Sequence, residues 1–579
     1  MRVQWLHHEV AAPCPLCGVA GPKTAMLSTA HVVPGNPPVT LLRCPACGAG
    51  FLERLAPPDY EMDVAEMVDY YVEQGAGIDL IVAPLHRLPP GTVRRCLEIG
   101  CSAGFALDFG RYAFGWEVLG VDPSPLATAG AEALGLPIRR AYFGADLDLG
   151  PELFDLAICS EVLEHIAEPH ALLAAIADCL SPDGILVLST PNLALIGPEA
   201  EEETLSRALS PGFHLVLYDR QALVRILEGA GFAAVRVEES PETLRAFAAR
   251  SPAVLERLRP ADPAAERTLL RRYFAARAGS APAASAFACG FAYRHFKECV
   301  NAGLHGEAEA SRARLAAVYR KRFGLDLERP DLEARRRLPF NLTGALFFSG
   351  ILELNGLGRP GRAAADFAAA VAAGSLLQGR QNPFGLRDGE TGELVAQSRK
   401  HLPMALAATD PERAVREIEA LDEAAAGEGL SASLLAEARA QTFIRLVNAG
   451  AYDAAERLAP GIVRQTDAPD GESVAEITAE TLDSLYCLGM LALHRERPGD
   501  AADLFARVHR LAGRRAGWHA EILWSARLHE GLSLRRAGRE APARAALAEV
   551  TGGEGRKGLP PVPPALAEAA RSLLAAGRG

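Results

Sequence analysis

The sequence predicts a multidomain protein with a small ribbon domain, a doubly wound α/β domain with a mostly parallel sheet, and an all-α domain. Three observations predict this order. Two matched cysteine turns lie near the N-terminus, strand-like and helix-like segments alternate between residues 91 and 239, and only a helical period remains beyond about Ser240. We expect the three parts to span residues 1–55, 56–245 and 246–579. A chain of 579 residues is long enough for several hydrophobic cores.

Composition and charge exclude several classes of protein. A formal charge of -12 and a pI near 5.7 disfavour nucleic acid as the main ligand, because phosphate binding needs a basic surface. The N-terminal residues lack a basic start followed by an apolar core, so we expect no signal peptide. The apolar stretch Leu342–Leu354 already contains Glu353, which argues against a membrane span. With eleven cysteines and no export signal, a reducing cytoplasm is the expected location.

The N-terminal part carries two copies of one short motif. Cys14-Pro-Leu-Cys17-Gly and Cys44-Pro-Ala-Cys47-Gly are near-identical turns that would each point two thiolates at one centre. Four thiolates give a closed tetrahedral zinc site of the structural kind, and so small a region could hardly fold without such a staple. We therefore predict a zinc ribbon held by these cysteines. A redox pair or unrelated cysteines remain the alternatives. The histidines that could substitute as ligands are His7, His8 and His31.

The central part alternates short apolar runs with helical patterns, which indicates a doubly wound parallel sheet. The strand candidates are Val93–Ile99, Trp116–Val121, Ile138–Tyr142, Phe154–Cys159, Ile185–Ser189 and Ala234–Glu238. A helical pattern from Phe105 to Phe114 follows the first strand. In such sheets ligands bind beyond the carboxyl ends of the strands, so the residues at those ends are the candidate site.

Polar and flexible residues gather at these strand ends. Gly100 and Gly104 would let the backbone approach a ligand closely. Glu98, at the end of the first strand, can meet an ammonium group directly or through water. Asp122, at the end of the second strand, is placed to accept both hydroxyls of a ribose. Phe143 follows the third strand, where an adenine edge would lie, and Ser160 and Glu161 follow the fourth strand.

Five sequence words between Tyr60 and Glu239 occur in a familiar order: LEIGCSAG, GWEVLGVDPSP, FDLAICSEVLEHI, LSPDGILVLSTPN and FHLVLYD. They resemble class I S-adenosylmethionine (SAM)-dependent methyltransferases, in the subgroup with E-V-L-E-H after the fourth strand. The resemblance implies a Rossmann-like fold and SAM as cofactor, with Ser102 in place of the usual middle glycine. A dinucleotide site would need G-x-G-x-x-G, whereas this loop reads G-C-S-A-G. The predicted cofactor-binding residues are Glu98, Gly100, Ser102, Gly104, Asp122, Phe143, Ser160 and Glu161.

Two histidines near the predicted methyl group are the candidate catalytic residues. His165 belongs to the E-V-L-E-H word, and His214 follows the fifth strand on the same edge of the sheet. An oxygen or acidic-carbon acceptor needs a base, and a histidine suits that role near neutral pH. In the alternative interpretation His165 orders a neighbouring loop through a hydrogen bond, and His214 orients substrate or has a structural role.

The C-terminal part repeats a spacing of small and large apolar residues. Gly489 is followed by Ala501 and Phe505, and Gly531 is followed by Ala543 and Leu547. Gly350, Ala363 and Phe367 repeat the scheme with one more residue in the turn. The spacing resembles tetratricopeptide repeats, which implies a surface for a protein partner or for self-association. A plain helical bundle or irregular solenoid is the alternative. Segments Gly374–Glu393 and Gly552–Pro564 are expected to be long loops.

Two hypotheses for the function follow. The first is a SAM-dependent methyltransferase that acts on a hydroxyl of a small molecule, sugar or glycan, with helical repeats that recruit a partner or substrate. The order of zinc region and methyltransferase domain resembles enzymes that methylate deoxysugars on nucleotide carriers, but helical repeats stand in place of their second α/β domain. The second is a non-catalytic scaffold or SAM sensor. The intact Glu98, Gly100, Gly104 and Asp122 argue for the enzyme.

Overall fold

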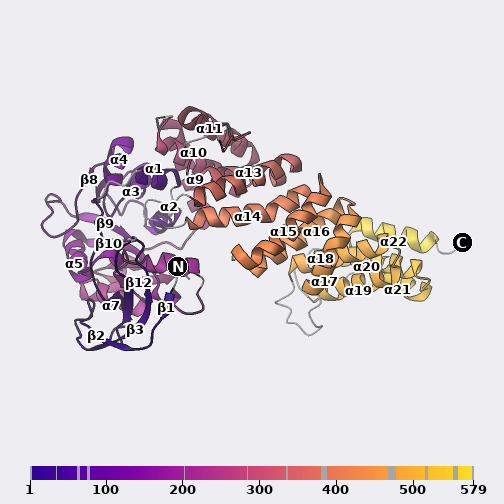
Figure 1. Ribbon diagram of the computed structural model, residues 1–579, viewed down its shortest axis with the longest axis horizontal. Coiled ribbons are helices and arrows are strands. Elements are labelled where there is room, and N and C mark those ends of the chain that lie inside the picture. Colours follow the sequence, from indigo (N-terminus) through magenta and orange to yellow (C-terminus); the bar gives the residue numbers. More distant parts are fainter. Residues whose placement is uncertain are drawn as a thin grey trace. The chain divides into compact units, whose positions relative to one another are not determined.

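The computed structural model divides the chain into two compact units (Figure 1). One unit comprises Met1–Ala345 with Ser375–Gly392, and the other comprises Leu346–Gly374 with Glu393–Gly579. The domain boundaries at residues 55 and 245 stay a prediction. The structure describes residues 3–33, 35–61, 66–74, 78–200, 202–240, 242–282, 284–333, 337–379, 388–428, 430–466, 478–514, 520–551 and 559–576.

An antiparallel sheet carries the two cysteine turns. Its strands are β1 (Val3–Trp5), β2 (Glu9–Ala11), β3 (Pro22–Thr29), β4 (Val39–Arg43), β5 (Gly50–Leu52) and β11 (Val216–Leu217). The strand order is β1-β3-β4-β5-β11, with β2 paired to β3. The first cysteine turn connects β2 to β3, and the second connects β4 to β5. Because β11 comes from far along the chain and pairs with β5, the sheet of the N-terminal region is completed by the central region.

The second sheet confirms the predicted doubly wound, mostly parallel α/β fold. Its strands are β6 (Arg95–Ile99), β7 (Glu117–Val121), β8 (Ile138–Arg139), β9 (Phe154–Ser160), β10 (Leu180–Pro191), β12 (Ala234–Glu239) and β13 (Thr243–Ala249). Their order is β12-β13-β10-β9-β6-β7-β8, and β13 alone runs antiparallel to both of its neighbours within this described sheet. The chain order reverses between β6 and β9, which is the switch point where ligands bind in such sheets.

The expectation that strand signals vanish beyond Ser240 is wrong for β13 (Thr243–Ala249). This strand lies between β10 and β12, and its residues from Ala246 to Ala249 are all buried. A strand covered on both faces has no alternation of polar and apolar residues, so its sequence, TLRAFAA, is easily mistaken for a helical pattern.

Alternate residues of the central strands enter two separate cores. Leu97, Ala157 and Leu188 belong to one core with the helices α5 (Pro169–Cys179) and α7 (Arg220–Gly229). Their sequence neighbours on the strands belong to the other core, with α3 (Phe105–Phe114), α4 (Pro125–Leu134) and further helices. The period of two along each strand therefore places helices on both faces of the sheet.

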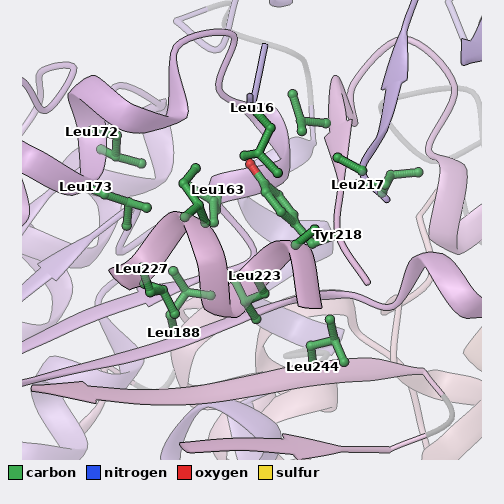
Figure 2. Close-up of a cluster of buried hydrophobic side chains, with 14 of the residues drawn as sticks. Leu16, Leu163, Leu172, Leu173, Leu188, Leu217, Tyr218, Leu223, Leu227 and Leu244 are labelled. Carbon is green, nitrogen blue, oxygen red and sulfur yellow. The ribbon is translucent and has the colours of Figure 1, made fainter. Parts of the chain in front are cut away.

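The first core also contains the cysteine-rich region (Figure 2). Leu16, from the first cysteine turn, lies beside the fully buried Tyr218, and leucines of α5, α7 and β13 surround this pair. The hydroxyl of Tyr218 has no hydrogen-bond partner among the described residues. The two sheets thus share one hydrophobic core.

Helices from beyond the sheet complete the same unit. They are α8 (Pro252–Glu256), α9 (Pro263–Ser280), α10 (Ala286–Asn301), α11 (His305–Phe323) and the start of α12 (Leu342–Ile351). The shorter elements of the unit are α1 (Met67–Gln74), α2 (Ile78–Val82), α6 (Glu202–Leu209) and the 3-10 helices η1 (Ala83–Arg87), η2 (Leu163–His165) and η3 (Leu193–Leu195).

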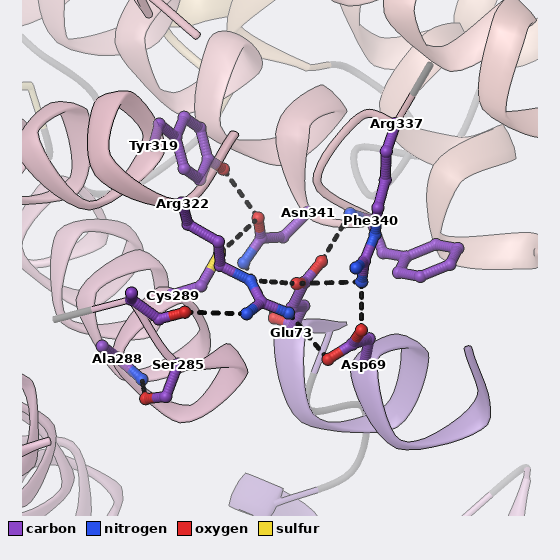
Figure 3. A network of polar contacts seen from close by, with 11 residues as sticks. Asp69, Glu73, Ser285, Ala288, Cys289, Tyr319, Arg322, Arg337, Phe340 and Asn341 are labelled. Carbon is purple, nitrogen blue, oxygen red and sulfur yellow. Dashed lines mark hydrogen bonds and ion pairs between the residues drawn. The ribbon is translucent and has the colours of Figure 1, made fainter. Parts of the chain in front are cut away.

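A network of ion pairs fixes α1 against α11 and the segment that precedes α12 (Figure 3). The guanidinium of Arg322 on α11 reaches Asp69 at 2.7 Å and Glu73 at 3.1 Å, both on α1. Arg337 also contacts both acids. The amide of Phe340 donates to Glu73 at 3.0 Å, and the side chain of Asn341 donates to the Glu73 carbonyl at 2.8 Å. The side chain of Glu73 is fully buried, so the network sets the place of α1.

The second unit consists, in its described residues, of helices, as predicted (Figure 1, orange to yellow). They are the π-helix η4 (Leu352–Gly356), α13 (Pro360–Gln378), α14 (Gly389–Leu406), α15 (Pro411–Glu428), α16 (Ala432–Asn448), α17 (Tyr452–Thr466), α18 (Ala479–His494), α19 (Pro498–Ala512), α20 (Ala520–Arg536), α21 (Glu540–Thr551) and α22 (Pro564–Ala576). Parts of α13 and α14 belong to the first unit. Among the described residues, every helix is too short or too polar to cross a lipid bilayer.

The repeated small residues of this unit lie where helices meet. A Cβ atom on Gly350 would lie 2.6 Å from Phe367, one on Gly489 would lie 2.7 Å from Phe505, and one on Gly531 would lie 2.7 Å from Leu547. Glycine is therefore required for these close approaches. The assignment to tetratricopeptide repeats stays a prediction.

The long loop expected at Gly374–Glu393 is partly wrong. Helix α13 continues to Gln378, and α14 begins at Gly389. Ala373 and Leu377 are buried, so packing of α13 outweighs the low helix propensity of Gly374. Residues 380–387 lie outside the described residues, as do residues 552–558 of the second expected loop.

Candidate active site and cysteine cluster

A cavity of about 1680 Å³ lies at the carboxyl ends of β6, β7 and β9. It exceeds the roughly 300–1,000 Å³ that is typical of ligand pockets, so it has room for two ligands side by side. Most of the predicted site residues line it: Glu98, Gly100, Ser102, Asp122, Phe143, Ser160, Glu161, His165 and His214. The structure therefore brings together residues from four of the five sequence words, and Phe143 from outside them. Gly104 does not belong to the cavity lining and instead precedes α3.

The loop after β6 is wound so tightly that it needs unusual backbone angles. Gly100 has a φ of 67°, and its amide donates to the Val121 carbonyl at 2.8 Å. A Cβ atom on Gly100 would lie 2.3 Å from Val162, so a larger residue does not fit. Ser102 has a φ of 50°, which few residues other than glycine adopt, and Gly104 has a φ of 75° at the N-cap of α3. The loop thus reaches the start of α3 within a few residues.

Asp122 directly follows β7 and holds this loop in place. Its Oδ2 accepts a hydrogen bond from the Ser102 amide at 2.7 Å. Its Oδ1 accepts from the Ser124 amide at 2.8 Å and from the Ser124 hydroxyl at 2.5 Å. Each carboxylate oxygen can accept more than one hydrogen bond, so Asp122 can orient the loop and still accept from a ligand.

Glu98 is a buried carboxyl group with an unused acceptor. The residue is 4% exposed, and its Oε2 has no hydrogen-bond partner among the described residues. Burial, together with the charge of Asp122, raises the pKa of Glu98 to about 8. A buried carboxylate without a partner is costly, so this position favours a cationic or hydrogen-donating ligand group in the cavity.

Two carboxyl groups follow β9 at the next part of the cavity wall. Glu161 has a φ of 54°, faces the cavity, and accepts at Oε1 from the Ser189 hydroxyl at 2.8 Å. Glu164, in η2, is fully buried and accepts at Oε2 from the Thr190 hydroxyl at 2.9 Å. Burial raises the pKa of both carboxyl groups, and the charge of Glu161 raises that of Glu164 further.

The two candidate catalytic histidines lie together. Their rings are 4.8 Å apart between centroids and nearly perpendicular. Nδ1 of His165 lies 2.9 Å from the Phe213 carbonyl, and Nδ1 of His214 lies 2.8 Å from the Ala208 carbonyl. A carbonyl oxygen only accepts, so Nδ1 of each ring carries the hydrogen and each Nε2 carries the lone pair.

The surroundings of these histidines make both of them weak bases. Burial, and for His165 also the neighbouring His214, lowers the pKa of His165 to about 3. Burial lowers the pKa of His214 to about 4. Nε2 of His165 lies 3.8 Å from Oε1 of Glu164, so a carboxylate there would stabilise an imidazolium. The ligand atoms of Glu164, His165 and His214 lie within 4.8 Å of one another and could also hold a cation.

Sequence reasoning missed an aromatic wall opposite the strand ends. Tyr60 contacts Nδ1 of His165 through its hydroxyl at 2.7 Å, and its ring meets that of Phe213 edge to face. Tyr70 and Tyr71 line the cavity from α1. The only sequence signal was the density of tyrosines from residue 60 to 71, ahead of the first strand of the sheet.

The four predicted zinc ligands form one cluster, and their thiols lie within 4.8 Å of one another. The Sγ atoms of Cys14 and Cys47 are 3.6 Å apart, and those of Cys17 and Cys44 are 3.7 Å apart. Sulfur ligands of tetrahedral zinc are separated by about 3.8 Å when each Zn–S bond is ~2.3 Å. This arrangement fits zinc without rearrangement.

The backbone around the cluster also favours a metal. Burial opposes ionisation of Cys44, but hydrogen bonds from the amides of Cys47 and Ala46 lower the pKa of this thiol to about 7. His31 is not part of the cluster, because its Nδ1 accepts from the Val33 amide at 2.9 Å. The cluster is joined to the α/β domain where the His170 ring, on α5, reaches the Leu16 carbonyl at 2.7 Å.

Comparison with known proteins gives matches over the central part of the chain. Residues 72–237 match a protein family described as "Methyltransferase domain". Over 156 residues the chain is 35% identical to a ubiquinone biosynthesis O-methyltransferase of Cereibacter sphaeroides, which covers 24% of this chain and 61% of that protein. Over 149 residues it is 33% identical to the protein of the same description from Dinoroseobacter shibae, covering 24% and 59%.

Each match thus spans less than two thirds of the relative. Among solved structures, a SAM-dependent methyltransferase from Mesorhizobium loti is 23% identical, covers 29% of this chain and 95% of its own, and has a TM-score of 0.25. The topology of the sheet rests on the strand order given above rather than on that likeness.

Proposed function

We propose that the chain transfers the methyl group of SAM to a hydroxyl of a small molecule, sugar or glycan, because residues 72–237 match a family described as "Methyltransferase domain". The observation that carries the proposal is the cavity itself. Its wall joins Glu98, Asp122, His165 and His214, which combine the groups a cationic nucleoside needs with those an acceptor needs. O-methylation is favoured because the relatives named above are described as O-methyltransferases.

The residues at the ends of β6 and β7 would bind the methyl donor. The unpartnered Oε2 of Glu98 is suited to the ammonium group of SAM, directly or through water. Asp122 would accept the ribose hydroxyls, and Phe143 would lie against the adenine. Gly100 and Ser102 would let the backbone approach the ligand, while Ser160 and Glu161 would border the methyl group. SAM supplies an electrophilic methyl group that an acceptor atom attacks in line.

The aromatic wall and the two histidines would bind and orient the acceptor. Positioning of the acceptor supplies much of the acceleration in such a displacement, because the donor is already activated. Nε2 of His165 is the best placed proton acceptor, since its Nδ1 is held by the Phe213 carbonyl and its product imidazolium would lie 3.8 Å from Glu164. The low pKa values of both histidines favour an acceptor with an acidic hydroxyl, which needs only a weak base.

We also propose that Cys14, Cys17, Cys44 and Cys47 hold one structural zinc ion. The sulfur spacings support this, and four thiolates leave no open position for catalysis.

The helical repeats of the second unit would recruit a protein partner or the substrate, and the test is whether a chain that lacks part of this unit keeps SAM binding but loses its partner.

Calorimetric titration of the full chain with SAM tests the proposal. We expect saturable binding that Asp122→Asn and Glu98→Gln each weaken at least tenfold, while Asp146→Asn, at an exposed acid away from the cavity lining, leaves affinity unchanged. Incubation with methyl-labelled SAM and fractionated extracts then identifies the acceptor.

Unchanged SAM affinity in both cavity variants would refute the donor site. Tight SAM binding with no labelled product from any fraction would instead favour a SAM-sensing scaffold. For the base, His165→Gln should lower turnover while SAM affinity is kept.

A further inference from the structure

A second cluster of metal-ligating side chains lies outside the cavity, between two helices. His295 and Cys299 are one turn apart on α10, and Glu307 lies in the first turn of α11. Their ligand atoms all lie within 4.8 Å of one another. Because α10 and α11 pack against each other in the first unit, the three side chains come from both members of a helix pair.

The distances within this cluster are those of a metal site. Nε2 of His295 lies 3.5 Å from Sγ of Cys299. When zinc binds a nitrogen at ~2.0–2.1 Å and a sulfur at ~2.3 Å with a tetrahedral angle, the two ligand atoms are about 3.6 Å apart. The histidine and the cysteine could therefore bind one ion with almost no change in the distance between their ligand atoms.

A further contact is compatible with the tautomer of the histidine that a metal requires. Nδ1 of His295 lies 2.9 Å from the hydroxyl of Ser311, which is on α11 and 2% exposed. A hydrogen bond from Nδ1–H to this oxygen leaves the lone pair on Nε2, on the side of Cys299. Metal-binding histidines commonly donate their other ring hydrogen in this way, which fixes both the tautomer and the orientation of the ring.

We propose that His295, Cys299 and Glu307 bind a borderline-soft divalent cation such as Zn²⁺, with a water molecule as the fourth ligand. One thiolate and one carboxylate would neutralise the charge of the ion. Glu307 has an exposed side chain, so it can rotate toward the other two ligands and give up its contact with Arg271, which at 3.9 Å is at the limit of an ion pair. The ion would join α10 to α11 at the end where the two helices are connected.

The competing explanation is a hydrogen bond from the thiol of Cys299 to the ring of His295. In this alternative Glu307 has no role and no metal ion is bound, so the metal content of the protein distinguishes the two explanations. The site is independent of the proposed methyl transfer and of the N-terminal cysteine cluster, because none of its residues belongs to either of them.

The test is the metal content of the full chain after loading with Zn²⁺ or Co²⁺ and removal of unbound ion. We expect the N-terminal cysteine cluster and this site to contribute one equivalent each in the unaltered protein, and this site's equivalent to be lost in His295→Ala and in Cys299→Ser. Cys289→Ser, which alters another buried thiol on α10, should keep both equivalents. The Co²⁺ form should lose the absorption of a site with a single thiolate when Cys299 is replaced.

Milder variants guard against loss of folding. Glu307→Gln changes an exposed side chain, and Ser311→Ala removes only the hydroxyl that holds the ring; each should weaken metal binding at this site by about 10–100-fold, with the helical circular dichroism unchanged. A single equivalent in the unaltered protein that persists in all four variants would overturn the proposal. So would loss of the same equivalent in Cys289→Ser.

Discussion

The buried Glu73 should make helix α1 less stable as the pH rises, and Glu73→Gln tests this. Burial of this carboxyl group, whose ordinary pKa is near 4.5, raises its pKa to about 7 even though Arg322 and Arg337 oppose the shift. The folded protein therefore holds a proton on Glu73 between these pH values, while the unfolded chain has released it. The stability contributed by this proton is fully present below about pH 4.5 and is lost as the pH rises through about 7.

The magnitude follows from the size of the shift. One pKa unit corresponds to ~1.36 kcal/mol, so a rise from near 4.5 to about 7 is worth about 3 kcal/mol, of which roughly 2 to 3 kcal/mol is lost between pH 5 and pH 8. Glutamine has nearly the same shape and does not titrate. The difference in stability between the unaltered protein and Glu73→Gln should therefore shift by that amount, in favour of the variant, from pH 5 to pH 8.

Hydrogen exchange of the peptide that covers α1 is the suitable assay, because it measures local opening of this helix in a chain with several cores. Comparison of the two proteins at each pH cancels the intrinsic pH dependence of exchange. Glu328→Gln, at an exposed acid in the same unit, is the control and should show no such change. A pH-independent difference between the unaltered protein and Glu73→Gln would refute the reasoning.

Three further predictions concern the cavity and the cysteine cluster. Gly100→Ala should destabilise the domain by about 1–3 kcal/mol and abolish SAM binding, because Gly100 has a positive φ and a Cβ atom there would lie 2.3 Å from Val162. Urea unfolding measures the loss of stability. A second substitution, Val162→Ala, should restore part of that stability. SAM binding at pH 7 should release about one proton, because a cationic ligand lowers the raised pKa of Glu98. Calorimetry in buffers of different ionisation enthalpy measures the number of protons released, and the Glu98→Gln variant should release none. Removal of zinc from the cysteine cluster by a chelator should lower the melting temperature and should expose Cys17 and Cys44 to a thiol reagent; a metal-free protein with an unchanged melting temperature would contradict the prediction.

The sequence predicted the parts of the fold and site that depend on short-range pattern. The apolar runs that became β6, β7 and β9 have the period and the terminal residues of parallel strands, so Glu98 and Asp122 could be placed at one edge. The helix from Phe105 to Phe114 lies between Gly104 and Gly115, both in the left-handed conformation, and its ends were predicted to the residue.

The rest depends on contacts between distant parts of the chain. Tyr60 reaches His165 across 105 positions of sequence, and no local pattern indicates that pairing. Likewise, the packing of α10 on α1 unites helices from beyond residue 245 with the cavity wall, whereas their helical period says only that each has an apolar face. Strand β13 was missed because it is buried on both faces, which removes the alternation that identifies a strand.

The pairing of β5 with β11 has a consequence for the order in which the protein folds during synthesis. Gly50 and Phe51 find their partners only at Leu217 and Val216. The four cysteines of the N-terminal cluster leave the ribosome long before that point. The nascent chain could therefore bind the proposed metal ion while β5 still lacks its partner strand β11. A strand edge that stays unpaired for a long time promotes association with other chains. A metal ion bound at this stage would fix the turn between β4 and β5. Strand β5 would then be held in place to pair with Val216 and Leu217 once these residues are synthesised.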